Sequence, residues 1–589
     1  MIYPDAFNPD LMSRIPLTAR TVLDVGCGSA AMASEFRRRN PAVMWYGIEK
    51  DPETARIAAT RSHRIAQVDL DVTVTPFGEQ TFDCIIFGDV LEHLKDPWAV
   101  LARHVTLLNP GGLILLCMPN AEHWSFAAQL LRGGWHYDRS GLFDRTHLRW
   151  FTAQTTHEAI AGAGLRAIDV AARVFDAEAC ASFIQDIGPG LDAIQVDRGD
   201  YFRRASPLQH VWRAVAQPIE RMNVLSTKLD PIGGVSDVRV TEPMDSLATL
   251  PDVFSIVVTP QELPMLEPGS PKIFIFHRPL LAGEEGLEPI RQLIGLGYVV
   301  VCEFDDHPDY IPVLQRPDIQ NFRAVHAIQT STLPLAEVLS RDNDEIAVFP
   351  NAVPRLAEPR NFADPDRMTL LFGSINRENE WPDYIDAINA VAEIAGPRLH
   401  FEVISDLGFF EALKTPHKNF IPLCDYATYL ETLSRCEISF MPLQDTPFNR
   451  CKSDLKFLEA SAHRVVSVAS PTVYGGVIEN GVTGVIFDDP ATLRDQLCAL
   501  LADPMAAMNM AEAARAYVGR ERMMAYQIGA RRNWYWSIWN DRERLHTALL
   551  KRVPELGPLP VPAMGRPVAQ PGETLQVASP DGSITVPGV

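Results

Sequence analysis

The chain lacks paired cysteines, a leader segment and long apolar runs. None of its nine cysteines stands in a C-x-x-C pair, and scattered cysteines of this kind fit buried free thiols in a reducing compartment. The first residues, MIYPDAFNPDLMSRIP, have neither the basic start nor the apolar core of a signal peptide. No stretch approaches the ~20 apolar residues of a membrane-spanning helix. We therefore expect a cytoplasmic protein and leave contact with a membrane surface open.

The chain also lacks an excess of positive charge. It carries 53 Lys and Arg against 74 Asp and Glu, a formal net charge of −21. Phosphate backbones need clustered cations, so a nucleic-acid partner is not expected, and the acidity is explained by solubility. The hydrophobic share of 47% is enough for buried cores. At about 100–200 residues per domain, 589 residues predict several folding units.

Short apolar runs alternate with longer amphipathic segments over most of the chain. This rhythm predicts an α/β protein with parallel sheets and crossover helices. The helices predicted most clearly are 52–61, 97–107 and 454–463. The predicted strands form three sets: 21–25, 44–48, 83–88 and 112–118; then 237–241, 254–258, 272–276, 298–303, 326–330 and 345–349; then 368–373, 400–404, 418–422, 437–441 and 464–468.

Breaks in this rhythm divide the chain. Residues 176–235 do not alternate, and they contain helix-like pieces such as HVWRAVAQPIERMNVL at 210–225. The segment after 552 is rich in Pro, Gly and small polar residues, which is typical of disorder. The predicted domains are 1–175, a helical connector 176–235, a pair of units 236–362 and 363–552, and a disordered tail 553–589.

A glycine-containing loop follows the first predicted strand. It reads DVGCG at 24–28, and Ala31 stands where a third glycine of a G-x-G-x-x-G fingerprint would be. A glycine pair after a strand lets the backbone approach a ligand, and it also fits a nicotinamide-binding fold. Glu49 ends the next strand about twenty residues on, where a carboxylate can accept ribose hydroxyl protons. FDCIIFGDVLEHLKDP follows at 82–97, and LLNPGGLILLCMPN at 107–120.

This order resembles the class I S-adenosylmethionine-dependent methyltransferases over residues 10–175. GLFDRTHLRWFT at 141–152 is similar to a segment of members that methylate small molecules or glycan intermediates. The resemblance implies a Rossmann-like domain with S-adenosylmethionine as cofactor. It implies that the methionine part is held by Asp24, Gly26 and Gly28, the ribose by Glu49, and the adenine by Asp69 and Leu70, with Asp71 as a competing candidate. Asp89 is expected to line the methyl-transfer pocket.

Methyl transfer from a sulfonium needs few catalytic side chains, because the methyl group is already activated and positioning supplies much of the rate. A base is needed only where an acceptor hydroxyl loses a proton, and His93 and His147 are the candidates. All three candidate residues also have a simpler interpretation. His93 could fix the loop after the strand, and His147 could be structural or bind an acidic acceptor. Asp89 could be a helix N-cap. The rival interpretation is an NAD-dependent oxidoreductase. Such an enzyme should have the third glycine, which is absent here, and hydride transfer does not explain the sequence LEHLKDP.

The second half contains another pattern, CKSDLKFLEASAHRVVSVASPTVYGGVIENGVTGVIF at 451–487. It resembles the nucleotide-sugar-binding segment of retaining, family-four-like glycosyltransferases with the GT-B fold. VVCEFDDHPDY at 300–310, PNAV at 350–353 and LFGSINREN at 371–379 are also similar to this group. The resemblance covers about residues 230–548 and implies two facing Rossmann-like domains.

A nucleoside diphosphate needs cationic groups and helix N-termini. Arg377 and Lys456 are placed to supply the cations, and Glu459 to accept the nucleotide ribose hydroxyls. Lys452 is a fourth candidate for binding the nucleotide sugar, and Asp454 lies nearby. Members of the group often have a second glutamate where this chain has Cys451. The plainer alternatives are a surface ion pair for the two cations and a surface helix position for Glu459.

A pair of carboxylates, Asp305 and Asp306, precedes His307 on the expected acceptor side of the cleft. They are candidates for polarising an acceptor hydroxyl or orienting the donor, and an exposed turn is the alternative. No second ligand cluster at suitable spacing accompanies them, so no metal site is predicted.

These patterns predict a bifunctional transferase. One half is expected to methylate an oxygen of a sugar or lipid-linked glycan with S-adenosylmethionine. The other is expected to transfer a sugar from a nucleotide-sugar donor, with retention carried over from the family. Because the two activities are expected on one chain, we associate them with a single process, the synthesis of a surface polysaccharide or lipopolysaccharide. The alternative is a scaffold of a glycan-assembly complex in which one or both units are degenerate.

Overall fold

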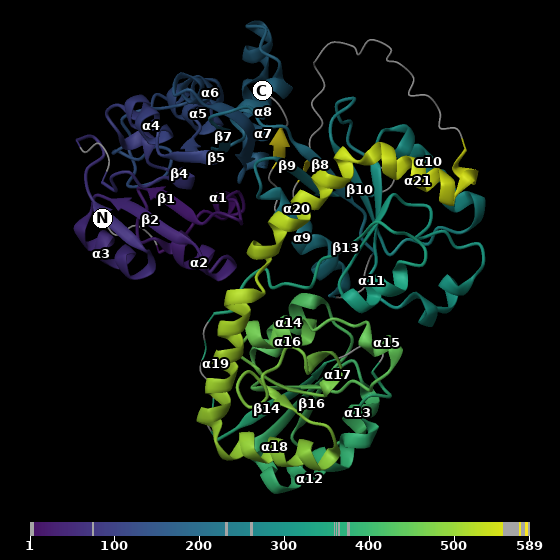
Figure 1. The fold of residues 1–589 in the computed structure, drawn as a ribbon. Helices are drawn as coiled ribbons and strands as arrows, with labels where there is room; N and C mark the ends of the chain where they lie inside the picture. Colours follow the sequence, from purple (N-terminus) through teal and green to yellow (C-terminus); the bar gives the residue numbers. More distant parts are fainter. Residues whose placement is uncertain are drawn as a thin grey trace.

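The chain folds into three α/β units, each built around its own sheet (Figure 1). The computed structural model describes residues 5–72, 76–229, 234–259, 263–358, 360, 362, 364, 366–373 and 377–557, and the backbone of 577–578 and 584–586. Strand pairing is parallel throughout the second and third sheets. In the first sheet it is parallel from β5 through β4, β1 and β2 to β3, and antiparallel in the other half. The α/β fold with several Rossmann-like sheets is therefore confirmed.

The first unit contains a mixed sheet in the order β20-β21-β6-β7-β5-β4-β1-β2-β3. β7 runs antiparallel to both of its neighbours, β5 and β6. The central strand β1 is buried at all five positions, because helices cover both faces of the sheet. Its strands are β1 (Thr21–Val25), β2 (Met44–Glu49), β3 (Arg64–Gln67), β4 (Phe82–Gly88), β5 (Leu108–Pro119), β6 (Arg166–Arg173), β7 (Gln209–Val215), β20 (Val577–Ala578) and β21 (Ile584–Val586).

Helices of the first unit connect these strands and pack on both faces, where they form two hydrophobic clusters. The longest of them, α7, belongs to the excursion between β6 and β7. The helices are α1 (Pro9–Met12), α2 (Ala31–Arg39), α3 (Pro52–Arg61), η1 (Leu91–His93), α4 (Pro97–Val105), α5 (Trp124–Leu131), α6 (Ala153–Gly162), α7 (Ala177–Ala193) and α8 (Arg198–Ala205).

The helix-like interpretation of residues 210–225 is wrong. His210–Val215 lies in β7 of the first sheet, and Met222–Leu225 lies in β8 of the second. Val211, Trp212, Ala214 and Val215 are all buried, because β7 is covered on both faces, and a strand buried on both faces shows no alternation. The first unit therefore includes β7, and we propose that its boundary lies near residue 215 rather than 175.

The second unit contains a parallel sheet in the order β13-β12-β11-β10-β8-β9. Its strands are β8 (Met222–Ser226), β9 (Val253–Val257), β10 (Lys272–His277), β11 (Val299–Glu303), β12 (Ala327–Thr330) and β13 (Ile346–Val348). Its helices include η2 (Asp237–Thr241), α9 (Glu242–Ala248), α10 (Gly283–Gly295), η3 (Pro308–Tyr310), η4 (Pro312–Gln315) and α11 (Leu333–Leu339).

Residues 237–241, predicted as a strand from their alternation, form a π-helical turn that continues into α9. Val238, Arg239 and Val240 are all buried, whereas a strand would point Arg239 to the face opposite the two valines. Arg239 is held inside by the carboxylate of Glu303, at 2.8 Å. The tertiary ion pair thus overrides the local pattern.

The third unit contains a parallel sheet in the order β16-β15-β14-β17-β18-β19. Its strands are β14 (Met368–Gly373), β15 (Leu399–Ile404), β16 (Lys418–Ile421), β17 (Ile438–Met441), β18 (Val466–Ala469) and β19 (Val485–Ile486). Its helices are η5 (Pro382–Tyr384), α12 (Ile385–Ala395), η6 (Gly396–Arg398), α13 (Leu407–Ala412), α14 (Tyr426–Ser434), α15 (Pro447–Arg450), α16 (Leu455–Ala462), α17 (Pro471–Tyr474), α18 (Pro490–Ala502) and α19 (Pro504–Glu521).

The last long helices return to the second unit (Figure 1). α20 (Met524–Asn540) and α21 (Arg542–Arg552) follow α19, and the short η7 (Pro554–Leu556) comes next. The hydroxyl of Tyr535 donates to Gln329 of β12 at 2.8 Å, and Leu549 joins the core under β10 and β11. The predicted unit 363–552 therefore does not hold as one body, because its last two helices cover the other sheet. No helix in the described part of the chain is both long and apolar enough to cross a bilayer.

The predicted disordered tail, 553–589, falls mostly outside the described residues. Within it, residues 553–557 complete the contact of α21 and η7 with the second unit. The short strand β21 pairs with β6 of the first sheet, and β20 pairs with β21.

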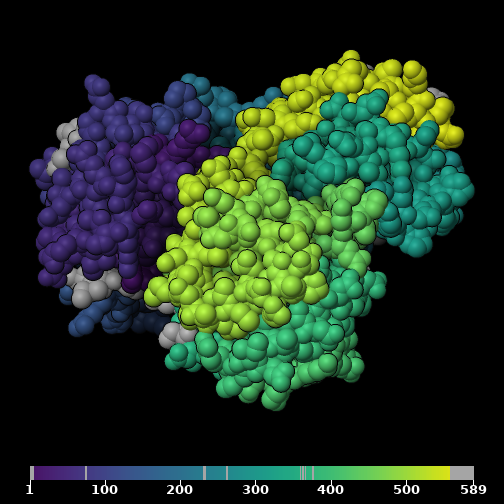
Figure 2. Space-filling model, turned by 60° about the horizontal axis from the view of Figure 1, so that its bottom comes forward, coloured from purple at the N-terminus to yellow at the C-terminus, as the bar shows by residue number. Residues whose placement is uncertain are grey.

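The first unit packs against both of the others, as the space-filling view shows (Figure 2). Arg38 of α2 donates to the carbonyl of Leu356, in the connection between the second and third sheets, at 2.9 Å. Arg213 of β7 donates to the carbonyl of Ala248 at the end of α9, at 2.8 Å. The first unit is thus fastened both to the connection between the other two units and to the second unit itself.

Candidate active sites

The glycine loop after β1 is shaped for close approach of a ligand. Gly26 has a φ of +71°, and a Cβ there would lie 2.7 Å from Val90, so only glycine fits. The N–H of Gly28 donates to Glu49 at 2.9 Å, and the N–H of Asp51 donates to the other Glu49 oxygen at 2.9 Å. Glu49, at the end of β2, therefore faces the loop, as the predicted ribose contact requires.

Asp24 lies buried in β1 just before this loop. Burial raises the pKa of its carboxyl to about 7, and the nearby Glu49 carboxylate adds to the rise. A buried acid of this kind gains most from a cationic partner, which favours the ionised form. The α-ammonium group of a methionine moiety is such a partner.

The predicted adenine residues follow β3. The carboxylate of Asp69 pairs with Lys50 at 2.7 Å and accepts from the N–H of Asp71 at 3.0 Å. Leu70 is buried. Asp71 accepts from the N–H of Lys95 at 3.0 Å, which makes it part of the loop scaffold. Asp69 and Leu70 therefore remain the better placed pair for a nucleoside.

Asp89 follows the end of β4 with a φ of +54°. That left-handed conformation costs a residue other than glycine about 1–2 kcal/mol, and such strain is found preferentially at functional sites. Its carboxylate accepts from the side chain of Gln209 and makes no capping bond to the short helix η1. The alternative of Asp89 as a helix N-cap is therefore wrong.

His93 and His147 come from distant parts of the first unit and meet, with ring centroids 4.8 Å apart. The Nδ1 atom of His93 lies 3.3 Å from the carbonyl of Thr146, and that of His147 lies 3.2 Å from the carbonyl of Leu142. The hydroxyl of Thr146 also lies 3.0 Å from Nδ1 of His93, and it donates its own proton to Asp144 at 2.6 Å. Since a carbonyl oxygen only accepts, these contacts favour the tautomer with the proton on Nδ1 in both rings. Both Nε2 lone pairs are therefore available to a proton or another ligand.

A second site lies between the second and third units, as a cavity of 220 Å³. Arg377, Lys456 and Glu459 all line it, together with Gly234 of the second unit and Tyr474 of the third. The structure thus brings three of the four predicted nucleotide-sugar residues to one place. The fourth, Lys452, does not line this cavity.

Glu459 is held at the bottom of this site. Its two oxygens accept from the hydroxyls of Tyr426 and Tyr429, each at 2.9 Å. Lys456 lies 3.7 Å from the same carboxylate and 3.8 Å from the ring centre of Tyr429, and burial lowers the pKa of its ammonium group. Glu459 is buried, so the alternative of a surface helix position is wrong.

The first turn of α16 also lines the cavity through Leu455 and Lys456. Asp454 precedes this helix but does not cap it with its side chain. Its carboxylate pairs instead with Arg522, with one contact of 3.0 Å. Uncapped N–H groups at a helix start favour an anion, which fits a diphosphate beside Lys456.

Asp305 and Asp306, the predicted acceptor-side pair, are engaged in ion pairs. Arg278 contacts both carboxylates at 2.7 Å, and Asp306 also pairs with Lys452 from the third unit. Burial would raise the pKa of Asp306, but Lys452 and Arg278 outweigh it and hold that pKa below its usual range. The pair therefore ties the two units together across the cleft in this structure.

Cys451, the departure from the glycosyltransferase pattern, is buried beside this bridge. Its carbonyl accepts from the hydroxyl of Thr332 in the second unit at 2.9 Å. The position therefore contributes a backbone contact between units and no acidic side chain.

Comparison with known proteins identifies the first unit. A family model described as a methyltransferase domain matches residues 6–170. The ubiquinone biosynthesis O-methyltransferase of Dinoroseobacter shibae is 30% identical over 177 residues, which cover 29% of this chain and 69% of that protein. Through its first unit, the chain belongs to the methyltransferase family. An uncharacterized methyltransferase of Mycobacterium bovis is 28% identical over 162 residues, 25% of this chain and 78% of that one.

Solved structures align with different parts of the chain. HepE of Anabaena, in complex with UDP-glucose, covers 54% of this chain and 100% of its own, with a TM-score of 0.37 and 11% identity. A putative methyltransferase of Bacillus halodurans covers 36% of this chain and 98% of its own, with a TM-score of 0.25 and 16% identity. The description of the second and third units therefore rests on their own geometry.

Two sets of site residues were not predicted. In the methyltransferase domain, Glu92 lies beside His93 in the sequence LEH and is buried. Its position next to an apolar run could have indicated from the sequence that this acid is buried. In the third unit Tyr426 and Tyr429 enclose Glu459. Their spacing of three residues on one helix face was visible, but nothing in the sequence tied that face to Glu459.

Cofactor binding by the methyltransferase domain is expected to depend on pH through Asp24. Its pKa of about 7 means that, below neutrality, a proton must leave before a cationic methionine group can pair with it. Affinity for S-adenosylmethionine should therefore fall as the pH is lowered, by up to about tenfold per pH unit. Calorimetric titration between about pH 5.5 and pH 7 measures this, and Asp24→Asn should flatten the profile. An unchanged slope in Asp24→Asn would assign the titration to another group.

Proposed function

We propose that this chain is a bifunctional transferase. Its first unit transfers a methyl group from S-adenosylmethionine to an oxygen, and its second and third units transfer a sugar from a nucleotide donor. The observation that carries the proposal is the convergence of Arg377, Lys456 and Glu459 on one cavity between two α/β units, in a chain whose first unit is a methyltransferase domain.

The methyltransferase domain has residues that fit the cofactor. A Cβ at Gly28 would meet nothing within 4 Å, so the open space there leaves room for the methionine part, and the buried Asp24 suits its ammonium group. Glu49 accepts the ribose hydroxyl protons, and Asp69 with Leu70 contacts the adenine. When bound, the cofactor supplies an activated methyl group on a sulfonium. Asp89 orients the acceptor, and the Nε2 atom of His93 or His147 receives the acceptor proton.

The cavity between the other two units fits a nucleoside diphosphate sugar. Arg377, Lys456 and the start of α16 offer cationic groups and N–H donors to the diphosphate. Glu459, kept in place by two tyrosine hydroxyls, accepts the ribose hydroxyls. Asp305, Asp306 and Lys452 lie on the acceptor side, where opening of the cleft would free them. Transfer with retention of configuration is part of the proposal.

The acceptor we propose is a sugar or lipid-linked glycan, used in surface polysaccharide or lipopolysaccharide synthesis. Two group transfers on one chain suit an acceptor that is both glycosylated and O-methylated. All nine cysteines are free thiols, which supports a cytoplasmic location. Contact with a membrane surface would follow if the acceptor is anchored to a lipid.

Both activities can be tested on the full chain. Labelled S-adenosylmethionine and a panel of nucleotide sugars are incubated with the protein and candidate glycans, and methyl incorporation and nucleoside diphosphate release are measured separately. We expect Asp24→Asn to abolish only the first and Arg377→Ala to diminish only the second. Binding of both donors without turnover of either would favour the scaffold alternative.

A further inference from the structure

Three potential metal ligands meet in the methyltransferase domain. Glu92 and His93 lie in η1, just after β4, and His147 lies in the segment between α5 and α6. One carboxylate oxygen and one nitrogen from each histidine all lie within 4.8 Å of one another. The cluster is separate from the glycine loop, Asp24 and Glu49.

Glu92 has no partner for its charge among the described residues. Both of its oxygens are buried, and neither has a hydrogen-bond partner there. A buried acid without a hydrogen bond is costly to keep, so its presence points to a ligand.

The two histidines are oriented as metal ligands are. The Nδ1 atom of each faces a backbone carbonyl, that of Thr146 or Leu142, and this leaves Nε2 as the acceptor. An outer carbonyl that fixes the imidazole tautomer is the usual second contact of a ligating histidine.

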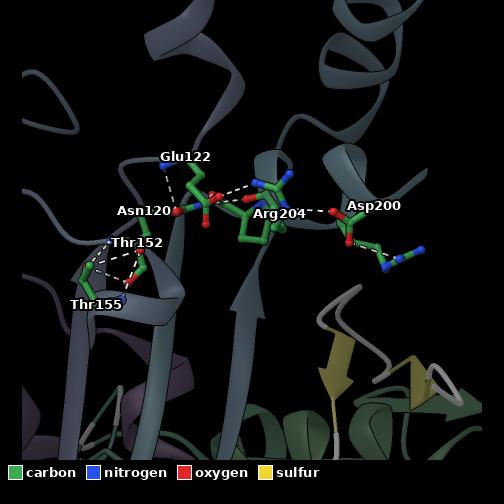
Figure 3. A network of polar contacts seen from close by, with 8 residues as sticks. Asn120, Glu122, Thr152, Thr155, Asp200 and Arg204 are labelled. Atoms are coloured by element: carbon green, nitrogen blue, oxygen red, sulfur yellow. Dashed lines mark hydrogen bonds and ion pairs between the residues drawn. The ribbon is translucent and has the colours of Figure 1, made fainter. Parts of the chain in front are cut away.

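The segment that carries His147 is held at its C-terminal end, next to the residues that follow β5. Ala121 donates to the carbonyl of Phe151 at 2.8 Å, and Asn120 donates to the carbonyl of Arg204 at 2.8 Å (Figure 3). Thr152 and Thr155 form a capping box at the start of α6 in the same view. His147 is therefore presented on a fixed loop, which reduces the entropic cost of closing a site around an ion.

We propose that Glu92, His93 and His147 bind a divalent cation. Two imidazole nitrogens and one carboxylate oxygen suit a first-row transition ion such as Mn²⁺, Fe²⁺ or Zn²⁺ better than Ca²⁺ or Mg²⁺. Three protein ligands leave positions open on the ion. The sequence alone predicts no metal site in this chain, because Asp305 and Asp306 lack a second ligand cluster and Glu92 lies far from His147 along the chain.

The cation has a role that rests on the proposed methyl transfer. An acceptor hydroxyl bound at an open position has a lowered pKa and loses its proton to solvent. The resulting oxygen then forms a bond to the methyl carbon, while the carbon–sulfur bond breaks and its electron pair stays on sulfur. The substrate class indicated is an alcohol or diol that can coordinate a metal. With the cation bound, His93 and His147 are ligands, and solvent takes the acceptor proton in place of either imidazole; without the cation, either Nε2 atom is the proposed base.

The test measures Mn²⁺ binding to the full chain without cofactor or acceptor. Protein stripped with a chelator is titrated with Mn²⁺ and followed by calorimetry and electron paramagnetic resonance. We expect one Mn²⁺ per chain at this site, and at least about tenfold weaker binding in Glu92→Gln and in His147→Ala. His136→Ala removes an exposed histidine from the same segment and should bind as the unaltered protein does.

S-adenosylhomocysteine affinity in each variant shows that the domain remains folded. The proposal is overturned if the unaltered chain binds no Mn²⁺ at about millimolar concentration, or if the folded Glu92→Gln and His147→Ala variants bind it equally well. Mn²⁺ binding without any methyl transfer would leave the metal site standing and count against the proposed function alone. A Glu92→Gln variant that does not fold is replaced by His93→Gln, whose ring is only partly buried.

Discussion

Lys456→Ala is expected to weaken nucleotide-sugar binding about 100-fold, because charge-assisted contacts to a diphosphate contribute about 1.5–3 kcal/mol each. The ammonium group lies at the start of α16 on the wall of the 220 Å³ cavity. Its present partners are the Glu459 carboxylate at 3.7 Å and the face of Tyr429. A diphosphate beside it would gain both the full charge and the N–H groups of the first helical turn. Calorimetric titration with a panel of nucleotide sugars and with the free nucleoside diphosphate measures the loss.

Lys414→Ala is the matched control. Lys414 is an exposed lysine of the same unit, with only a loose contact to Asp386 at 3.7 Å, so its removal should leave binding unchanged. The loss in Lys456→Ala should be equal for the sugar donor and for the free diphosphate, because the predicted contact is to phosphate. Unaltered affinity in Lys456→Ala would place the donor elsewhere than in this cavity.

Glu49→Ala is expected to lower affinity for S-adenosylmethionine by about 100-fold or more, since two hydrogen bonds from ribose hydroxyls to a carboxylate are lost at about 1.5–3 kcal/mol each. The same change removes the acceptor for the N–H groups of Gly28 and Asp51, so the glycine loop loses its tie to β2. Both effects act on the cofactor and neither acts on the cavity of the other two units. Titration with S-adenosylmethionine and S-adenosylhomocysteine is the measurement.

Two controls separate the ribose contact from loop damage. Glu53→Ala removes an exposed acid from α3 and should bind as the unaltered chain does. Glu49→Gln keeps an oxygen acceptor for Gly28, and its affinity should lie between those of the other two. A Glu49→Ala variant that binds normally would mean that the ribose lies elsewhere.

Strands and site motifs were predictable where one short segment contains all the information. The glycine loop and Glu49 follow directly from DVGCG and the strand after it, and the structure places them in hydrogen-bond contact. Arg377, Lys456 and Glu459 were likewise found from local patterns and meet in one cavity. In each case strand ends and helix starts carry the residues, so their positions follow from the fold class.

The rest depended on contacts between distant segments. β7 is covered on both faces, so its sequence lacks the alternation of apolar and polar residues that marks a strand. For that reason the segment was interpreted as a helix. Residues 237–241 form a helical turn because Arg239 is drawn inward by Glu303, 64 residues away. Asp306 and Lys452 were assigned separate roles, yet they pair across 146 residues. No local pattern records such partners.

The return of α20 and α21 to the second unit has a consequence for how this protein is made. The strands of the second sheet are complete at Val348, but the last two helices that cover it begin at Met524. At about 5–20 residues per second the ribosome needs roughly 9–35 s to supply them. During that time the apolar underside of the second sheet is open, while the first unit, apart from the late strands β20 and β21, already has all its strands. Nascent chains released shortly before residue 524 should therefore be aggregation-prone in the second unit, a vulnerability that a chaperone or rapid, uninterrupted synthesis would have to cover.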